Sequence, residues 1–183
     1  MKVAILAGSN RRESASTKLV RYAGSRLIAW GHDAEVFDLR ERVLPLYDPD
    51  TDSEPEEAKA LAKLVAESDA VVLASPEYHG TISGVLKNAL DYLGAEHFDG
   101  KAVLSVSAAG GAVGVSSLTH LQAIVRNLHG VNCPDWISVG GDQRRFGPDG
   151  SPLDERMRLR VENVLGNFIR LASVLAAANR VRV

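Results

Sequence analysis

Two kinds of apolar pattern alternate along the chain. Short, nearly continuous apolar runs such as 70–75 are typical of strands covered on both faces, and longer segments with apolar residues three or four apart are typical of amphipathic helices. These patterns predict strands at 2–7, 34–39, 70–75, 102–107 and 136–139, and helices at about 16–30, 55–68, 84–93, 115–128 and 153–179. Strands that alternate with helices predict an α/β fold, a doubly wound parallel sheet in one domain that spans residues 1–183.

Composition narrows the classes of function. A chain of 183 residues is long enough for one domain with a sizeable core, and its formal net charge of −2 argues against a nucleic-acid partner. No apolar run reaches the length of a membrane span, and the chain enters a strand without a signal segment, so we expect a cytoplasmic protein. The single Cys133 excludes an intramolecular disulfide or a zinc site built on several thiols, and no metal site is expected.

The segment 8–17, which joins the first strand to the first helix, has the composition of an anion-binding loop. The first amides of a helix lack intrahelical partners, and the helix dipole favours an anion there. Ser9, Ser14, Ser16 and Thr17 add hydroxyl groups, and Arg11 or its neighbour can bind phosphate oxygens bidentately. The loop lacks the glycine spacing of dinucleotide-binding and nucleoside-triphosphatase loops, so it suits a monophosphate; plain helix capping is the alternative.

Two further loops follow strands of the same sheet. Ligands of open parallel sheets bind at the carboxyl ends of the strands, so these loops and the first should meet at one edge. The loop that begins at Pro76 offers the flat side chains of Tyr78 and His79 and a glycine that lets a planar ligand approach the backbone. The loop 107–114 adds a hydroxyl and several unhindered amides. Each loop alone could be an ordinary surface turn, but together they predict a site for a phosphorylated planar ligand.

These segments resemble the NAD(P)H-dependent FMN reductase family. Residues 8–14 are similar to its Gly-Ser-x-Arg-x-x-Ser pattern, and residues 76–80 with 84–91 are similar to its Pro-Glu-Tyr-Asn and Gly-x-Leu-Lys-Asn-x-x-Asp segment. The resemblance covers about residues 2–175 and implies a flavodoxin-like fold with five strands in the order 2-1-3-4-5. It also implies bound FMN, hydride transfer from NADPH or NADH, and electron transfer to a small-molecule acceptor such as a quinone, azo compound, metal oxyanion or free flavin. It further implies a homodimer or homotetramer.

The same resemblance assigns cofactor contacts to particular positions. It gives the FMN phosphate to the first loop and the isoalloxazine ring to the other two, a set that comprises Ser9, Arg11, Ser14, Ser16, Thr17, Pro76, Glu77, Tyr78, His79, Gly80, Ser107, Gly110 and Gly111. Hydride transfer between two rings needs no acid, base or nucleophile, so no catalytic side chain is expected. Two positions depart from the family: His79 stands where Asn is usual, and Ala15 stands where many members carry an aromatic residue.

Two other functions fit the residues. One is a flavodoxin-type electron carrier that does not react with nicotinamide, against which the central Arg11 and the small net charge argue; the other is a flavin-free domain that binds a sugar phosphate or nucleotide. Lys87 and Asp91, four residues apart on a helix, suggest an ion pair within the helix or, as the resemblance favours, between subunits. Trp136, with Arg144 and Arg145, is a candidate for an interface or a nucleotide pocket.

Overall fold

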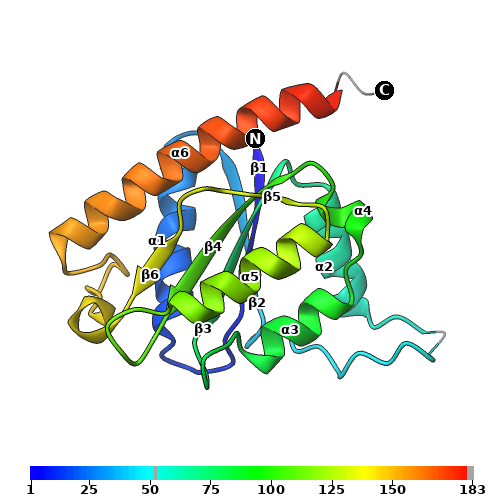
Figure 1. Cartoon of the computed structure of the whole chain (residues 1–183), viewed down its shortest axis with the longest axis horizontal. Coiled ribbons are helices and arrows are strands. Elements are labelled where there is room, and N and C mark those ends of the chain that lie inside the picture. The colour runs from blue at the N-terminus through cyan, green and yellow to red at the C-terminus, as the bar shows by residue number, and fades with distance from the viewer. Residues whose placement is uncertain (52, 181–183) are drawn as a thin grey trace.

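A parallel sheet lies between two layers of helices in the computed structural model, which describes residues 1–51 and 53–180 (Figure 1). The strands run in the order β2-β1-β3-β4-β5, and β6 also pairs with β4. Every strand pair is parallel. The predicted doubly wound sheet and its order are therefore confirmed. The strands are β1 (Lys2–Ala7), β2 (Asp33–Asp38), β3 (Ala70–Pro76), β4 (Ala102–Ala108), β5 (Val131–Asn132) and β6 (Ile137–Val139).

The helices divide between the two faces because alternate strand residues point to opposite sides. Val3 and Ile5 of β1 belong to a core covered by α1 and α6, whereas Ala4 and Leu6 belong to a second core covered by α2, α3 and α5 (Figure 1). This double cover explains the uninterrupted apolar runs of the central strands. The helices are α1 (Ala15–Ala29), α2 (Glu56–Ala66), α3 (Gly84–Asp91), α4 (Ala95–Phe98), α5 (Val115–Asn127) and α6 (Glu155–Arg180), with a 3₁₀ turn, η1 (Gly141–Arg144).

The outer edge next to β4 differs from the prediction. One strand was expected at 136–139, but two short strands, β5 and β6, pair with different ends of β4. The interruption at 133–136 contains Pro134, which has no amide to donate to the sheet. Cys133 begins this interruption and is buried, and burial raises the pKa of its thiol. The free cysteine is thus a small core residue.

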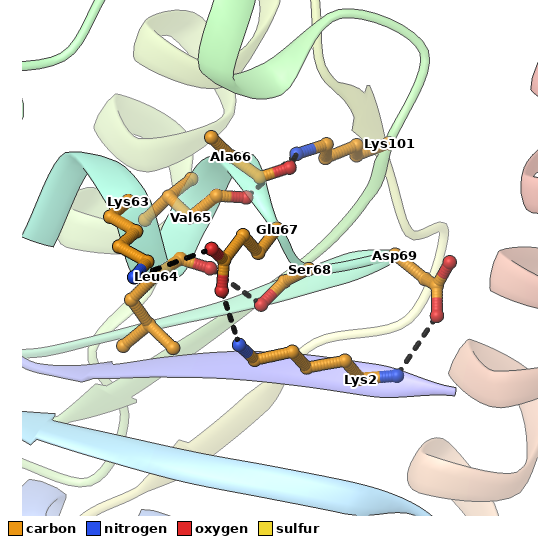
Figure 2. A network of polar contacts seen from close by, with 9 residues as sticks. All are labelled: Lys2, Lys63, Leu64, Val65, Ala66, Glu67, Ser68, Asp69 and Lys101. Carbon is orange, nitrogen blue, oxygen red and sulfur yellow. Dashed lines mark hydrogen bonds and ion pairs between the residues drawn. The ribbon is translucent and has the colours of Figure 1, made fainter.

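Polar groups at the amino ends of the strands are paired with one another (Figure 2). Lys2 Nζ donates to Glu67 Oε2 at 3.0 Å, and this hydrogen bond lowers the pKa of the Glu67 carboxyl. Lys101 Nζ donates to the carbonyl oxygens of Val65 (2.6 Å) and Ala66 (2.9 Å) at the end of α2. Burial lowers the pKa of this lysine. Both lysines therefore connect the start of a strand to the region where α2 ends.

The last helix, α6, is the one helix in the described ranges whose length and composition would allow it to cross a membrane. No such segment is expected from the sequence, because charged residues interrupt the apolar positions of this helix. In the fold, α6 lies across the sheet and buries Val161, Leu165 and Phe168 in the core that it shares with α1. Its observed packing is that of a covering helix.

Candidate functional site

Close packing fixes the position of the loop that follows β1. A Cβ atom on Gly8 would lie 2.5 Å from the Ala74 carbonyl oxygen and 2.7 Å from Leu86 Cβ, so only glycine fits without a shift. The Gly8 amide donates to Ala74 O at 2.8 Å, and the Ser83 hydroxyl donates to Gly8 O at 2.5 Å. The first loop is therefore attached to both β3 and the start of α3.

The loop leads into the amino terminus of α1, where several polar groups converge. Ser14 is the N-cap: its Oγ accepts a hydrogen bond from the Thr17 amide at 3.3 Å and lies 2.9 Å from Ser16 Oγ. The amides of Ala15 and Ser16, in the first turn, have no partner within the helix. The Thr17 hydroxyl is buried and has no hydrogen-bond partner in the described part of the chain. Capping thus accounts for Ser14, but it leaves donors in this first turn for a ligand.

The loop after β3 contains a tight turn. Tyr78 and Thr81 exchange two backbone hydrogen bonds, of 3.0 and 3.1 Å, and the residues between them have positive φ angles, 52° at His79 and 74° at Gly80. This is the pattern of a type I′ turn, which favours Asn followed by Gly. Histidine is also among the non-glycine residues enriched at positive φ. The family's Asn at this position is thus explained by backbone conformation, and His79 preserves the turn.

Glu77 has a structural role that the sequence analysis did not foresee. Its amide donates to Ala108 O at 2.9 Å, which extends the pairing of β3 with β4. Its Oε2 accepts hydrogen bonds from the Ser117 amide at 2.9 Å and the Ser117 hydroxyl at 3.0 Å, in the first turn of α5. Ser117 Oγ also lies 2.7 Å from Ser107 Oγ. The carboxylate therefore caps α5 and connects the second and third candidate loops.

The three loops surround a cleft of about 490 Å³, within the range of small-molecule sites. The predicted residues that line it are Arg11, Ser14, Ser16, Pro76, Glu77, Tyr78 and Gly110. The remaining predicted residues do not line it, and they are Ser9, Thr17, His79, Gly80, Ser107 and Gly111. Ser9, for example, is buried and accepts a hydrogen bond from the Arg11 amide at 3.3 Å. The convergence of the three loops is as predicted.

The η1 turn forms a further wall of the cleft. Gly141, Arg144 and Arg145 line it, and the Gly141 amide donates to Gly111 O at 3.0 Å. From the sequence, the two arginines are candidates only for an interface or a nucleotide pocket. Their position after the last strand was the available signal, because this loop leaves the sheet at the same edge as the others.

Charge in the cleft is predominantly positive. Glu13 forms an ion pair with Lys18, and the hydrogen bond between them lowers the pKa of the Glu13 carboxyl. The Glu77 carboxylate is hydrogen-bonded to the first turn of α5. Arg11, by contrast, has no carboxylate oxygen within 4 Å in residues 1–51 and 53–180, and Arg145 reaches Asp142 only at 4.0 Å. An anionic group in the cleft would therefore meet cations that are not already neutralised.

Comparison with known proteins decides the family. Residues 1–144 match the profile of the NADPH-dependent FMN reductases. The chain belongs to this family. An FMN-dependent NADPH-azoreductase from Staphylococcus aureus is 35% identical to it over 156 residues, which cover 82% of this chain and 83% of the relative.

Solved structures share the fold of this FMN reductase. The FerB flavoenzyme NAD(P)H:(acceptor) oxidoreductase from Paracoccus denitrificans superposes with a TM-score of 0.78 at 22% identity, covering 94% of this chain and 97% of that one. The apo form of an NADH:FMN oxidoreductase (EMOB) gives 0.74 at 19% identity, with 91% and 87% covered. An archaeal flavodoxin gives 0.64 at 12% identity, with 96% and 99% covered. At these identities the likeness concerns the fold.

Family membership makes the chain an FMN reductase-type enzyme that uses FMN with NADPH. The residues of the cleft fit such a cofactor. Its phosphate would meet the free first-turn amides of α1, the unpartnered Thr17 hydroxyl and Arg11, while Tyr78 and Gly110 leave space for a planar ring. Ala15 lines the cleft as well, and its small side chain leaves more space than the aromatic residue of many family members.

Proposed function

We propose that this FMN reductase binds FMN in the 490 Å³ cleft, oxidises NADPH there and transfers the electrons to a small acceptor of the azo or quinone class. The observation that carries the proposal is the convergence of the loops after β1, β3 and β4 beside free donors at the start of α1. The Staphylococcus aureus relative is named as an azoreductase, and this name supports an azo compound as the acceptor. Metal oxyanions and free flavin are further acceptors compatible with an open site.

The first loop binds the phosphate in this proposal. Arg11 supplies a charge-assisted contact, and the Ala15 and Ser16 amides supply donors along the axis of α1. The Ser14 and Ser16 hydroxyls, 2.9 Å apart, and the Thr17 hydroxyl complete the donor set. Ser9 supports this set indirectly, because its Oγ holds the Arg11 amide.

The second and third loops position the ring. Pro76 and Tyr78 border the cleft on one side and Gly110 borders it on the other. The type I′ turn at His79 and Gly80 holds the Tyr78 backbone, and the bonds of Glu77 and Ser107 to Ser117 hold the loop that includes Gly110 and Gly111. These residues keep the ring and the nicotinamide in one orientation, which is the main contribution a protein makes to hydride transfer.

The three loops would hold FMN, and when bound this cofactor would supply the redox chemistry, with hydride acceptance from NADPH and release of two electrons to the acceptor. The chain needs no proton-transfer residue for this step, and no catalytic acid or base is assigned. Because NADPH and the acceptor use one open cleft, the reaction is expected to show ping-pong kinetics.

The alternative of a flavodoxin-type carrier is tested by one experiment. Purified protein loaded with FMN is mixed with NADPH without oxygen, and the visible flavin spectrum is followed. If the protein is a reductase, NADPH bleaches the flavin absorbance soon after mixing, and an added azo dye restores the absorbance. Flavin that stays oxidised in the presence of excess NADPH would show that the chain is a carrier.

The proposal includes a homodimer or homotetramer, as the family resemblance implies, and the cytoplasmic location expected from the sequence. Val43, Leu46 and Tyr47 expose apolar surface beside α3, which is consistent with contact between subunits. Lys87 and Asp91 form an ion pair within α3, with Nζ and Oδ1 2.5 Å apart, so within a single chain this pair is satisfied without a partner subunit. Sedimentation of the purified enzyme measures the assembly.

A further inference from the structure

Two hollows lie next to the cofactor cleft, along β6 and the start of α6, and together they are called the groove. The first hollow has a volume of about 540 Å³, and Gly141 lines both it and the cleft. The second hollow has a volume of about 520 Å³, and Trp136, Arg156 and Arg160 line both hollows. Between the cleft and the first hollow, the η1 turn contacts the loop after β4, and the Gly141 amide donates to Gly111 O at 3.0 Å. A long ligand that lies over this rim would have one end in the cleft and the other end beside Trp136.

The groove carries two cations without partners. Arg156 and Arg160 are one helical turn apart on α6 and thus lie on the same face, and both are exposed. Neither guanidinium lies within 4 Å of a carboxylate in the part of the chain that the structure describes. Arg158, between them in sequence, is paired with Glu155 at 3.0 Å. The groove thus presents the two free arginines and excludes the neutralised one.

The other charged groups of the groove are already engaged. Asp135 Oδ2 accepts a hydrogen bond from Asn167 Nδ2 at 2.8 Å, and Asp142 lies 4.0 Å from Arg145. Asp154 Oδ1 accepts hydrogen bonds from the first-turn amides of α6 at 2.9 and 3.3 Å. The attraction for an anion therefore comes from the guanidinium groups and not from the end of the helix.

We infer that this groove binds the 2′-phosphoadenosine end of NADPH, with Arg156 and Arg160 on the 2′-phosphate and the Trp136 indole against the adenine. The inference rests on the proposed function, which places the nicotinamide in the cofactor cleft. Two guanidinium groups on one face suit a dianionic phosphate, and an indole face suits a purine. Arg144 and Arg145 line the cleft next to the shared Gly141, at the rim that the pyrophosphate would cross.

This assignment makes Arg156 and Arg160 the residues that distinguish NADPH from NADH, because the two coenzymes differ only in the 2′-phosphate. The first test compares an Arg156→Ala/Arg160→Ala double variant with Arg158→Ala as the matched control. We expect the KM for NADPH to rise about tenfold or more in the double variant, the loss typical of charge-assisted contacts, with less than a twofold change for NADH and an unchanged kcat. The control should match the wild-type enzyme. An equal rise for both coenzymes, or no rise, overturns the inference.

The second test does not depend on turnover. Calorimetry on the FMN-loaded protein compares 2′,5′-ADP with 5′-AMP as probes. The wild-type protein should bind 2′,5′-ADP at least about tenfold more tightly, and the double variant should lose this preference. No binding of 2′,5′-ADP, or a preference that survives in the double variant, overturns the inference. If the protein prefers 2′,5′-ADP but NADPH does not reduce its flavin, the proposed function alone is refuted. If NADPH reduces the flavin but the protein does not prefer 2′,5′-ADP, this inference alone is refuted.

Discussion

The two ends of the parallel sheet differ in how their polar groups are used. At the amino ends, Lys2 is bonded to Glu67, and Lys101 is bonded to the last carbonyls of α2 (Figure 2). At the carboxyl ends, Arg11 has no carboxylate within 4 Å among the described residues, and the buried Thr17 hydroxyl has no partner there. The two lysines at the amino ends are thus bonded within the chain, whereas Arg11 and the Thr17 hydroxyl at the carboxyl ends are left for a ligand.

This difference separates stability from binding. Groups that are satisfied within the chain stabilise the fold, whereas groups without partners gain their interactions only when a ligand arrives. Substitutions at the amino ends should therefore change the free energy of unfolding and leave cofactor affinity unchanged. Substitutions of groups without partners at the carboxyl ends should lower cofactor affinity and leave the free energy of unfolding unchanged. Substitutions of the residues that pack beneath these groups should change both quantities.

The largest effect is expected at Gly8, the packing residue on which the first loop depends. In Gly8→Ala the new Cβ would overlap the Ala74 carbonyl oxygen, so we expect a loss of about 2–3 kcal/mol in the free energy of unfolding, as for other overpacked sites. Gly166→Ala is the matched control, because its Cβ meets open space. The higher helix propensity of alanine should raise the free energy of unfolding of this variant by about 0.5–1 kcal/mol. Urea unfolding measures both. Equal stability of the two variants contradicts the close packing of the loop.

Arg11→Ala tests the binding end directly. We expect FMN affinity to fall by about 1.5–3 kcal/mol, the scale of a hydrogen bond to a charged group, while the apoprotein unfolds as the wild type does. Arg12→Ala is the control, since Arg12 does not line the cleft. Fluorescence titration with FMN gives both dissociation constants. If the two variants bind FMN equally, Arg11 is not a phosphate ligand.

Glu77→Ala should affect stability at the carboxyl end, because this carboxylate is committed to α5. Removing the cap of the Ser117 amide is expected to cost about 1–2 kcal/mol and to speed hydrogen exchange of that amide. Glu77→Gln keeps an oxygen acceptor and should recover part of the loss. Exchange of the Ser117 amide at the wild-type rate in Glu77→Ala would refute the capping role.

Lys101→Met should act on stability alone. The substitution removes the donor to the Val65 and Ala66 carbonyls and keeps the aliphatic stem, so we expect a loss of about 1 kcal/mol at this helix end. FMN affinity should stay within error of the wild-type value. A change in FMN affinity equal to that of Arg11→Ala would remove the distinction between the two ends.

The smallest effect is a pH dependence at the amino ends. The pKa of Glu67 is lowered from its ordinary value of 4.5 by the hydrogen bond from Lys2. Its contribution to stability is therefore complete above pH 4.5 and is lost as the pH falls through the lowered pKa. The stability difference between wild type and Glu67→Gln, measured by urea unfolding, should be present at pH 7 and vanish in stronger acid. A difference that grows as the pH falls has the wrong sign for this ion pair.

Much of the fold follows from the sequence because the central strands are covered on both faces. The run at 70–75 has no polar alternation, and it corresponds to the fully buried β3. The short elements β5, α4 and η1 were not predicted, because segments of two to four residues carry no usable periodicity. The two-residue β5 is defined by its pairing with β4, which no local pattern reveals.

The site was predictable to the level of loops but not of contacts. The rule that ligands bind at the carboxyl ends of parallel strands brings the three loops together. It does not reveal that Glu77 caps a helix through Ser117, 40 residues away, or that η1 turns Arg144 and Arg145 toward the cleft. The replacement of the family's Asn by His79 is explained only by the φ angle of 52° at this position, because the turn requires a residue that adopts a positive φ angle.

Titration of the apoprotein with FMN and with riboflavin isolates the role of the first loop as a phosphate site, because the two ligands differ only in the phosphate. We expect one FMN bound per chain and an affinity for FMN at least about a hundredfold above that for riboflavin, since several charge-assisted contacts depend on the phosphate. Equal affinity for the two ligands, or a folded apoprotein that takes up neither, would contradict this expectation.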